Sequence, residues 1–310
     1  MIPATFVVAE HGLARLGTCT EEAVHQFLDV LDAAEASARV VAWEEVFSVP
    51  TDPFPTLSDF LYRPDSPMDR DLRLLLGRRI ERMSFWGAAE GSPELEWTDG
   101  DDGVDIAPSI GLCVSRVGAE PWALLSLAAS PSIAGLCQMR PLGGTGSAAA
   151  VWCVVEIDHL TAFWRDSLTR YEATPTEMSA ASAAAFPRTH FAPEVWTQTN
   201  RFEGSWRDVR ERLVEVLSGL DDGAAAVFAV ESQNDMRARV MSAAYGVDCS
   251  PESPNTHRNA TAMRRREAEF DGIVHVCEWH AKLEPHQNRV HFAVAEGRLL
   301  VGIFAKHLPT

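Results

Sequence analysis

Apolar and ionisable side chains alternate along the end of the chain, and this alternation constrains the fold more than any other feature. Successive side chains of a β-strand point to opposite faces, so a period of two predicts strands with one apolar and one ionisable face. Three such stretches, 273–283, 289–295 and 298–308, are separated by the short connections 284–288 and 296–297. We therefore predict a three-stranded antiparallel meander.

The same pattern assigns the side chains of the meander to its two faces. The apolar side chains that we expect in the core are Trp279, Val290, Phe292, Val301, Ile303 and Ala305. The ionisable side chains that we expect together on the opposite face are Glu278, His280, Lys282, Arg289, His291 and Lys306. A register slip of one residue would bury most of the ionisable set, so the pattern fixes the pairing of the first two strands.

The ionisable face has an unusual composition for a surface that merely contacts water. Such faces usually carry hydroxyl, amide and carboxylate side chains, whereas this one has histidines, lysines and an arginine with a single carboxylate. Histidine and glutamate can move protons near neutral pH, and lysine and arginine can stabilise the charge on a reacting phosphate. The face therefore suits phosphate chemistry, with an ordinary solvated sheet face as the alternative.

A metal site on this face is a further alternative. Glu278, His280 and His291 could form a triad of two histidines and one carboxylate. Lys282 and Arg289 would lie beside that triad and would repel a divalent cation. We therefore predict neither a metal nor another cofactor.

The charge of the chain divides between its end and the remainder. The formal net charge is −17, which excludes a protein that coats nucleic acid over most of its surface. Residues 251–310, by contrast, hold eight arginines and lysines against seven acidic residues. They also hold six of the ten histidines and both lysines of the chain. The end of the chain is thus the region where we expect an anionic ligand.

For the chain as a whole, the sequence predicts an α+β protein of two domains. Residues 1–172 form an acidic domain of mixed α/β type, in which the apolar runs between 110 and 157 predict an antiparallel sheet. Residues 173–187 are a linker or a weak helix, and residues 188–310 form the second domain. In that domain we expect a helical hairpin that turns at Asp221-Asp222-Gly223, then a long loop over 249–267, and then the meander.

This C-terminal pattern resembles the RelE/HigB-like family of mRNA-cleaving toxins. The likeness covers about residues 203–310 and includes the helical hairpin, the meander with its His, Lys and Arg side chains, and the ending IFAKHLP. It implies RNA cleavage without a metal, in which Lys282, Arg289 and Lys306 would contact the scissile phosphate. It also implies that Glu278, His280 or His291 would transfer protons. The family's members are small, basic and of one domain, whereas this chain is long and acidic.

The phrases CEWHAKL, RVHF and VGIFAKHLP also resemble the closing segment of a group of bacterial proteins with no assigned activity. We therefore expect a ribonuclease-like effector whose acidic domain regulates or targets it. The resemblance to the RelE/HigB-like family implies that such an effector is a bacterial toxin or a phage-defence protein. Its substrate would be RNA or a nucleotide, and its partner could be an antitoxin. The alternative is a non-enzymatic binding protein whose basic face docks an acidic partner or a nucleotide.

The start of the chain has no basic segment followed by a long apolar run, and no stretch of 18 apolar residues occurs, which predicts no membrane association. The six cysteines are scattered without paired spacing. Scattered cysteines favour reduced thiols and a cytoplasmic location.

Overall fold

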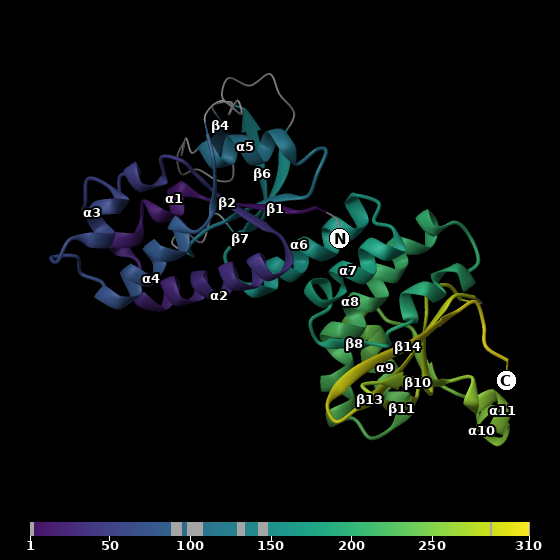
Figure 1. Ribbon diagram of the computed structural model, residues 1–310. Helices are drawn as coiled ribbons and strands as arrows, with labels where there is room; N and C mark the ends of the chain where they lie inside the picture. Colours follow the sequence, from purple (N-terminus) through teal and green to yellow (C-terminus); the bar gives the residue numbers. More distant parts are fainter. Residues whose placement is uncertain are drawn as a thin grey trace. The chain divides into compact units, whose positions relative to one another are not determined.

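The computed structural model describes residues 3–87, 95–97, 108–128, 134–141, 148–285 and 287–309. The chain divides into two compact units, Ile2–Phe163 and Trp164–Thr310 (Figure 1). The division falls inside helix α6 (Ile157–Arg170), upstream of the boundary that the composition suggested at residue 173. None of the helices in the described part of the chain has the length and apolar character needed to cross a bilayer.

The segment 173–187, for which a linker and a weak helix were both open, contains helix α7 (Pro175–Ala185). Thr174 begins this helix with a capping box, because its hydroxyl accepts from the backbone N–H of Glu177 and the Glu177 carboxylate accepts from the N–H of Thr174. The small side chains of the segment therefore form regular structure.

The first unit contains a seven-stranded sheet in the order β3-β2-β1-β5-β7-β6-β4. Its strands are β1 (Thr5–Val8), β2 (Arg39–Trp43), β3 (Ser84–Trp86), β4 (Leu95–Trp97), β5 (Trp122–Leu125), β6 (Gly135–Pro141) and β7 (Ala149–Val154). Its other helical segments are α1 (Glu10–Leu13), η1 (Leu16–Thr18), α2 (Glu21–Ser37), η2 (Val46–Ser48), α3 (Leu57–Tyr62), α4 (Arg70–Glu81) and α5 (Pro108–Arg116). The first five strands in this order are parallel, and β6 and β4 are antiparallel to their neighbours.

The prediction of an antiparallel sheet between 110 and 157 is therefore wrong for β5, which is parallel to both of its neighbours. The pairing of β6 with β7 is antiparallel, as predicted. The apolar run that suggested a strand near residue 110 is helix α5, whose side chains Ile110, Leu112 and Cys113 are buried. A short apolar run fits a buried helix as well as a buried strand. The helix precedes β5, which pairs parallel to β1.

The second unit contains a five-stranded sheet in the order β8-β14-β13-β12-β9 and a separate hairpin of β10 and β11. Its strands are β8 (Thr189–Phe191), β9 (Cys249–Pro251), β10 (Glu267–Phe270), β11 (Ile273–Val276), β12 (Trp279–Lys282), β13 (Arg289–Ala295) and β14 (Arg298–Ala305). Its remaining helical segments are η4 (Val195–Arg201), α8 (Trp206–Val230), α9 (Asn234–Tyr245), α10 (Pro254–Arg258) and α11 (Ala260–Arg264). The antiparallel meander β12-β13-β14 is as expected, except that its first strand begins only at Trp279.

Two predictions for the segment before the meander are wrong. Helix α8 runs straight through Asp221-Asp222-Gly223, where we expected a turn. Asp221 is buried and pairs with Arg165 at 2.8 Å, and a Cβ on Gly223 would clash with the ring of Tyr245. These polar and small residues therefore serve packing inside the helix rather than a turn.

The expected loop 249–267 is largely regular. It forms β9, α10 and α11, and it leads into β10. Ser253 and Asn259 cap the two short helices through their side-chain oxygens. These are local turn-forming residues, which is why the composition alone suggested a loop.

The register of the meander places the histidines as a pair. Trp279 lies opposite Phe292, and His280 lies opposite His291, as the alternation predicted. Between β13 and β14 the register shifts, so that Phe292 pairs with Val301 whereas His291 pairs with Ile303. This β-bulge reverses the faces of the end of β14.

Gly302 occupies the bulge because β10 packs closely there. A Cβ on Gly302 would lie 2.6 Å from both Ala268 Cβ and Cys277 Sγ. The predictions that Ile303 joins the side of Val290 and that Lys306 joins the histidines are consequently wrong. Phe304 takes the place opposite Val290.

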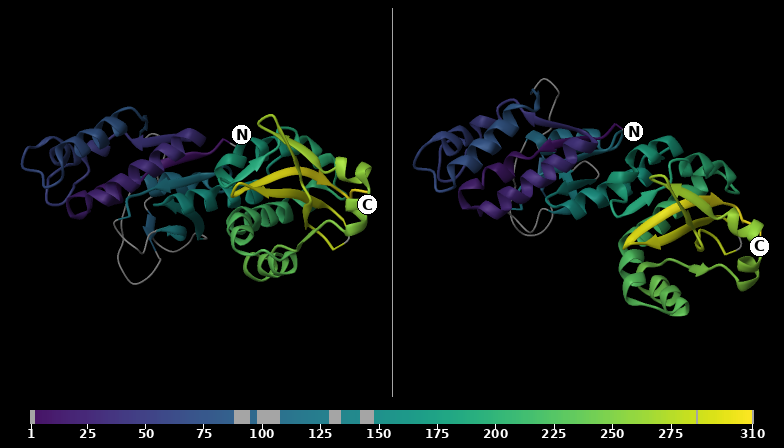
Figure 2. Two further views of the ribbon diagram at one scale, coloured as in Figure 1. Left: turned by 90° about the horizontal axis from the view of Figure 1, so that it is seen from below. Right: turned by 60° about the horizontal axis from the view of Figure 1, so that its bottom comes forward.

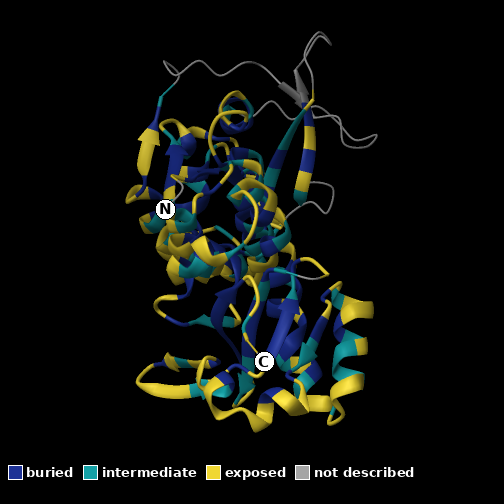
Figure 3. Ribbon diagram, turned by 90° about the vertical axis from the view of Figure 1, so that its right-hand side faces the viewer, coloured by how far each residue is buried: buried dark blue, intermediate teal, exposed yellow. Residues whose placement is uncertain are grey.

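Both faces of the meander are covered by other parts of the second unit. On one face, the ring of Phe228 in α8 lies 4.8 Å from that of Trp279 and 6.0 Å from that of Phe292. Figure 2 shows the yellow strands β13 and β14 beside the green helices. On the other face, Glu252 and Arg266 from the segment after β9 cover His280 and His291. The strands are accordingly mostly buried (Figure 3).

Candidate functional site

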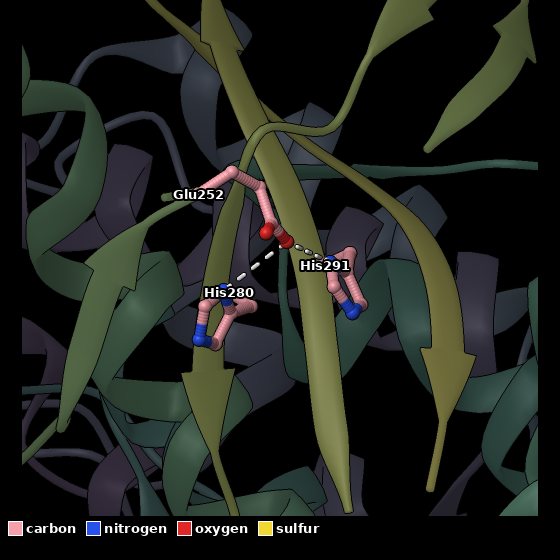
Figure 4. Close-up of side chains that lie close together, drawn as sticks. All are labelled: Glu252, His280 and His291. Carbon is pink, nitrogen blue, oxygen red and sulfur yellow. Dashed lines mark ion pairs between the residues drawn. The ribbon is translucent and has the colours of Figure 1, made fainter. Parts of the chain in front are cut away.

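Three ionisable side chains meet on the second face of the meander. His280 comes from β12, His291 from β13, and Glu252 follows β9 (Figure 4). The backbone holds all three, because His280 pairs with His291 across the strands and with Ser250 of β9 on its other side. The relative exposures are 8% for Glu252, 6% for His280 and 1% for His291, so the expected open face is a buried one.

Glu252 is the centre of this cluster. Its Oε1 atom lies 2.7 Å from Nε of Arg266, 3.5 Å from Nδ1 of His280 and 3.6 Å from Nδ1 of His291. Burial alone would raise the pKa of Glu252, but His280 and Arg266 outweigh burial and lower that pKa to about 2. The carboxylate is therefore ionised at neutral pH and faces Nδ1 of both imidazoles.

Arg266 and Arg289 bring two cations to the cluster. Arg266 is buried, and its Nη1 donates to the carbonyl oxygens of Ala262 and Pro309. Arg289 Nη1 forms a hydrogen bond with Nε2 of His280, and burial lowers the pKa of Arg289 from its ordinary value. Both guanidinium groups remain fixed positive charges.

His291 is buried, and neither of its ring nitrogens has a hydrogen-bond partner within the described part of the chain. Burial, together with the neighbouring His280, lowers the pKa of His291 to about 3. The ring is therefore neutral at pH 7, with one N–H donor and one acceptor to offer. A buried polar group without a partner is costly, and it is a common mark of a ligand site.

The cluster lines a pocket of about 250 Å³. The lining residues are Ser250, Pro251, Glu252, Ser253, Thr256, Arg266, His280, Arg289, His291, His307 and Leu308. The two arginines exceed the single carboxylate by one charge. A small pocket with net positive charge and several donors suits an oxyanion such as a phosphate group.

Glu252, His280 and His291 also have the composition of a metal triad. One ligand atom from each lies within 4.8 Å of the others. The Arg266 guanidinium, however, already forms an ion pair with the Glu252 oxygen that both imidazoles face. Arg289 contacts Nε2 of His280. These two cations oppose a divalent ion, so the residues fit an anion better than a metal.

Only three of the six site residues predicted from the sequence line this pocket. His280, His291 and Arg289 line it. Glu278 does not, because it lines a different pocket next to Trp279 and its Oε2 lies 3.9 Å from Nε2 of His257. The residue precedes β12, where the chain leaves the hairpin β10-β11.

The two lysines also lie outside the pocket lining. Lys282 Nζ lies 3.1 Å from a carboxylate oxygen of Asp248. Lys306 Nζ lies 2.6 Å from Oε2 of Glu203, because the bulge at Gly302 places Ala305 rather than Lys306 beside Arg289. Both are therefore balanced by a carboxylate.

The sequence analysis missed Ser250, Glu252 and Arg266. All three lie in the segment that we expected to be a loop, and Arg266 ends a run of arginines that is typical of a solvated surface. The capping residues Ser253 and Asn259 could have indicated short helices there. No sequence signal placed Glu252 against the histidines.

Compared with protein-family models, with curated proteins and with solved structures, the chain gives no match.

Proposed function

We propose that the second unit is a metal-independent ribonuclease that receives the scissile phosphodiester in the pocket of His280 and His291. The observation that carries this proposal is His291, a buried imidazole beside two arginines whose two ring nitrogens have no hydrogen-bond partner within the described residues. RNA contains its own nucleophile, the 2′-hydroxyl. A protein that cleaves it needs only proton transfer and charge stabilisation at phosphorus.

Each group of the pocket has a role in this reaction. Arg289 and Arg266 stabilise the charge that develops on the phosphate oxygens. The two imidazoles accept the proton of the 2′-hydroxyl and donate one to the leaving oxygen, and Glu252 stabilises the imidazolium that forms. Negative charge on a bound phosphate favours protonated histidine, which raises the pKa of His291 from its low value in the free protein.

RNA cleavage by the purified protein in EDTA tests this proposal, with and without ribosomes. We expect His291→Ala and Arg289→Met to reduce the cleavage rate by 10²-fold or more, the usual contribution of an acid–base group. His275→Ala and Arg265→Met are matched controls, because these side chains lie outside the pocket lining, and they should cleave normally. Loss of wild-type cleavage in EDTA, or no cleavage under either condition, would contradict the proposal.

A second candidate is a pocket that binds a phosphate-bearing ligand such as a nucleotide without cleaving it. The low pKa of His291 favours this candidate, because a weakly basic imidazole is a poor proton acceptor. Calorimetry separates the two functions. A nucleotide that binds the wild type but not Arg289→Met, in a protein that does not cleave RNA, would establish the binding function.

A further inference from the structure

Ser250 stands in line with two members of the cluster. Its Oγ atom lies 3.3 Å from Nε2 of His280, and Nδ1 of the same imidazole lies 3.5 Å from Oε1 of Glu252. A hydroxyl, an imidazole and a carboxylate in this order form the arrangement that activates a serine as a nucleophile. Distances slightly beyond ordinary hydrogen bonds are common at such sites before a ligand binds.

Backbone pairing fixes the geometry of this line. Ser250 lies opposite His280 where β9 pairs with β12, and the backbone N–H of Glu252 donates to the carbonyl oxygen of Glu278 at 2.8 Å. The Arg266 ion pair holds the Glu252 carboxylate. With Nδ1–H of His280 facing this carboxylate, Nε2 is left as the acceptor for the serine proton.

Ser250 is the accessible member of the line. It is partly exposed and lines the pocket, whereas His280 and Glu252 are buried behind it. Arg289 reaches the same imidazole nitrogen, and its own Nε is a buried donor that has no hydrogen-bond partner within the described residues. A ligand oxyanion can take this donor and draw the guanidinium away from His280, which frees Nε2 for Ser250.

We propose that Ser250 is a nucleophile that forms a covalent phosphoserine intermediate in this pocket. This inference deepens the proposed function and rests on the same phosphate site. It widens the substrate class to phosphodiesters that lack a 2′-hydroxyl, because the protein then supplies the attacking oxygen itself.

The chemical steps balance without a redox partner. Ser250 Oγ bonds to phosphorus while the bond from phosphorus to the leaving oxygen breaks. The serine proton passes to Nε2 of His280 and then to the leaving oxygen. In the second step a water oxygen bonds to phosphorus and gives its proton to His280, the bond from Oγ to phosphorus breaks, and His280 returns the proton to Ser250.

A fluorophosphonate probe tests the nucleophile directly, since the serine oxygen displaces fluoride and leaves a stable adduct. We expect mass spectrometry of the full chain and its peptides to locate the adduct on Ser250 in the wild type. Ser250→Ala should lose that adduct, and Ser242→Ala, which removes an exposed serine of α9, should keep it. His280→Ala should slow labelling by about 10²-fold or more, provided that its thermal melt shows a folded protein.

The labelling and the cleavage assay together distinguish this inference from the proposed function. If Ser250→Ala cleaves RNA at the wild-type rate and no adduct forms on Ser250, the nucleophile is overturned while the ribonuclease stands. If the adduct forms on Ser250 but neither RNA nor DNA is cleaved, the nucleophile stands and the ribonuclease is overturned. Cleavage of a DNA oligonucleotide by the wild type but not by Ser250→Ala would support the wider substrate class.

Discussion

The two faces of the β12-β13 pair are both covered but are chemically opposite. On the first face Trp279 and Phe292 pack against Phe228 of α8, and their burial stabilises the fold through the removal of apolar surface from water. On the second face His280 and His291 pack against a buried ion pair. The same two strands thus carry an ordinary core on one side and a polar cluster on the other.

The second face contributes less to stability than the first. A buried ion pair often contributes less than apolar residues of the same volume would, and an unpaired buried imidazole costs free energy. Proteins depart from good packing mostly at functional sites.

The largest effect is expected on the apolar face. Trp279→Ala should lower the free energy of unfolding by roughly 3 to 5 kcal/mol, the usual cost of truncating a large buried aromatic side chain. Chemical denaturation of the variant and of His275→Ala, on the neighbouring hairpin, would measure it. A loss below about 1 kcal/mol would show that α8 does not pack on this face as described.

On the polar face, Arg266→Met should cost about 3 kcal/mol. It leaves Glu252 without its ion pair at 2.7 Å, and an uncompensated buried charge is strongly destabilising. The double variant Glu252→Leu with Arg266→Met removes both charges and should recover most of the loss. A double variant as unstable as the single one would mean that the ion pair itself stabilises the fold.

The contrast between the faces also explains how far the sequence could predict the structure. The register of β12 and β13 was predictable, because alternation leaves one pairing that buries Trp279 with Phe292. The covering of the histidines was not, because Glu252 and Arg266 lie in a segment whose composition is that of a loop. The shift at Gly302 depends on the close approach of β10, which is a tertiary contact.

The parallel sheet of the first unit was missed for a related reason. The apolar run of α5 has no periodicity that distinguishes a buried helix from a buried strand, and its assignment decides the direction of β5. The sequence pattern singled out His280, His291 and Arg289, and all three line the pocket. Ser250 and Glu252 also line the pocket, and only the fold places them there.

A smaller effect is expected on stability at acidic pH. The pKa of His291 is about 3 in the folded protein and 6.5 as its ordinary value, so between these pH values the unfolded chain binds a proton that the folded chain does not. Stability should therefore fall as the pH drops from 6.5 towards 3. At pH 5 this single group accounts for about 2 kcal/mol.

His291→Leu removes that group and keeps a similar volume. Denaturation at pH 7.5 and pH 5 should show that the variant loses less stability on acidification than the wild type. Glu252 also loses its stabilisation in acid, because its folded pKa of about 2 lies below the ordinary 4.5, but that loss occurs in a lower pH window. Parallel losses in both proteins over pH 7.5 to 5 would contradict the buried neutral state of His291.

The smallest expected effect is that of His291→Leu on stability at neutral pH. His291→Leu should stabilise the protein by about 1 kcal/mol at pH 7.5, since it replaces two buried nitrogens that lack a hydrogen-bond partner within the described residues with apolar atoms. A thermal melt measures the change, and His275→Leu is the control for a histidine that is only partly buried. A loss of stability in His291→Leu would show that the imidazole makes a favourable interaction in the free protein.

Thermal melts in the presence of phosphate test whether the polar face is an anion site. A ligand that binds only the folded protein raises its free energy of unfolding, by about 2.7 kcal/mol when the ligand concentration is a hundred times the dissociation constant. The melting temperature rises accordingly. We predict that inorganic phosphate raises the melting temperature of the wild type and that Arg289→Met abolishes this rise. EDTA and zinc should leave the melting temperature unchanged. A rise with zinc and none with phosphate would contradict the account and would make Glu252, His280 and His291 a metal site.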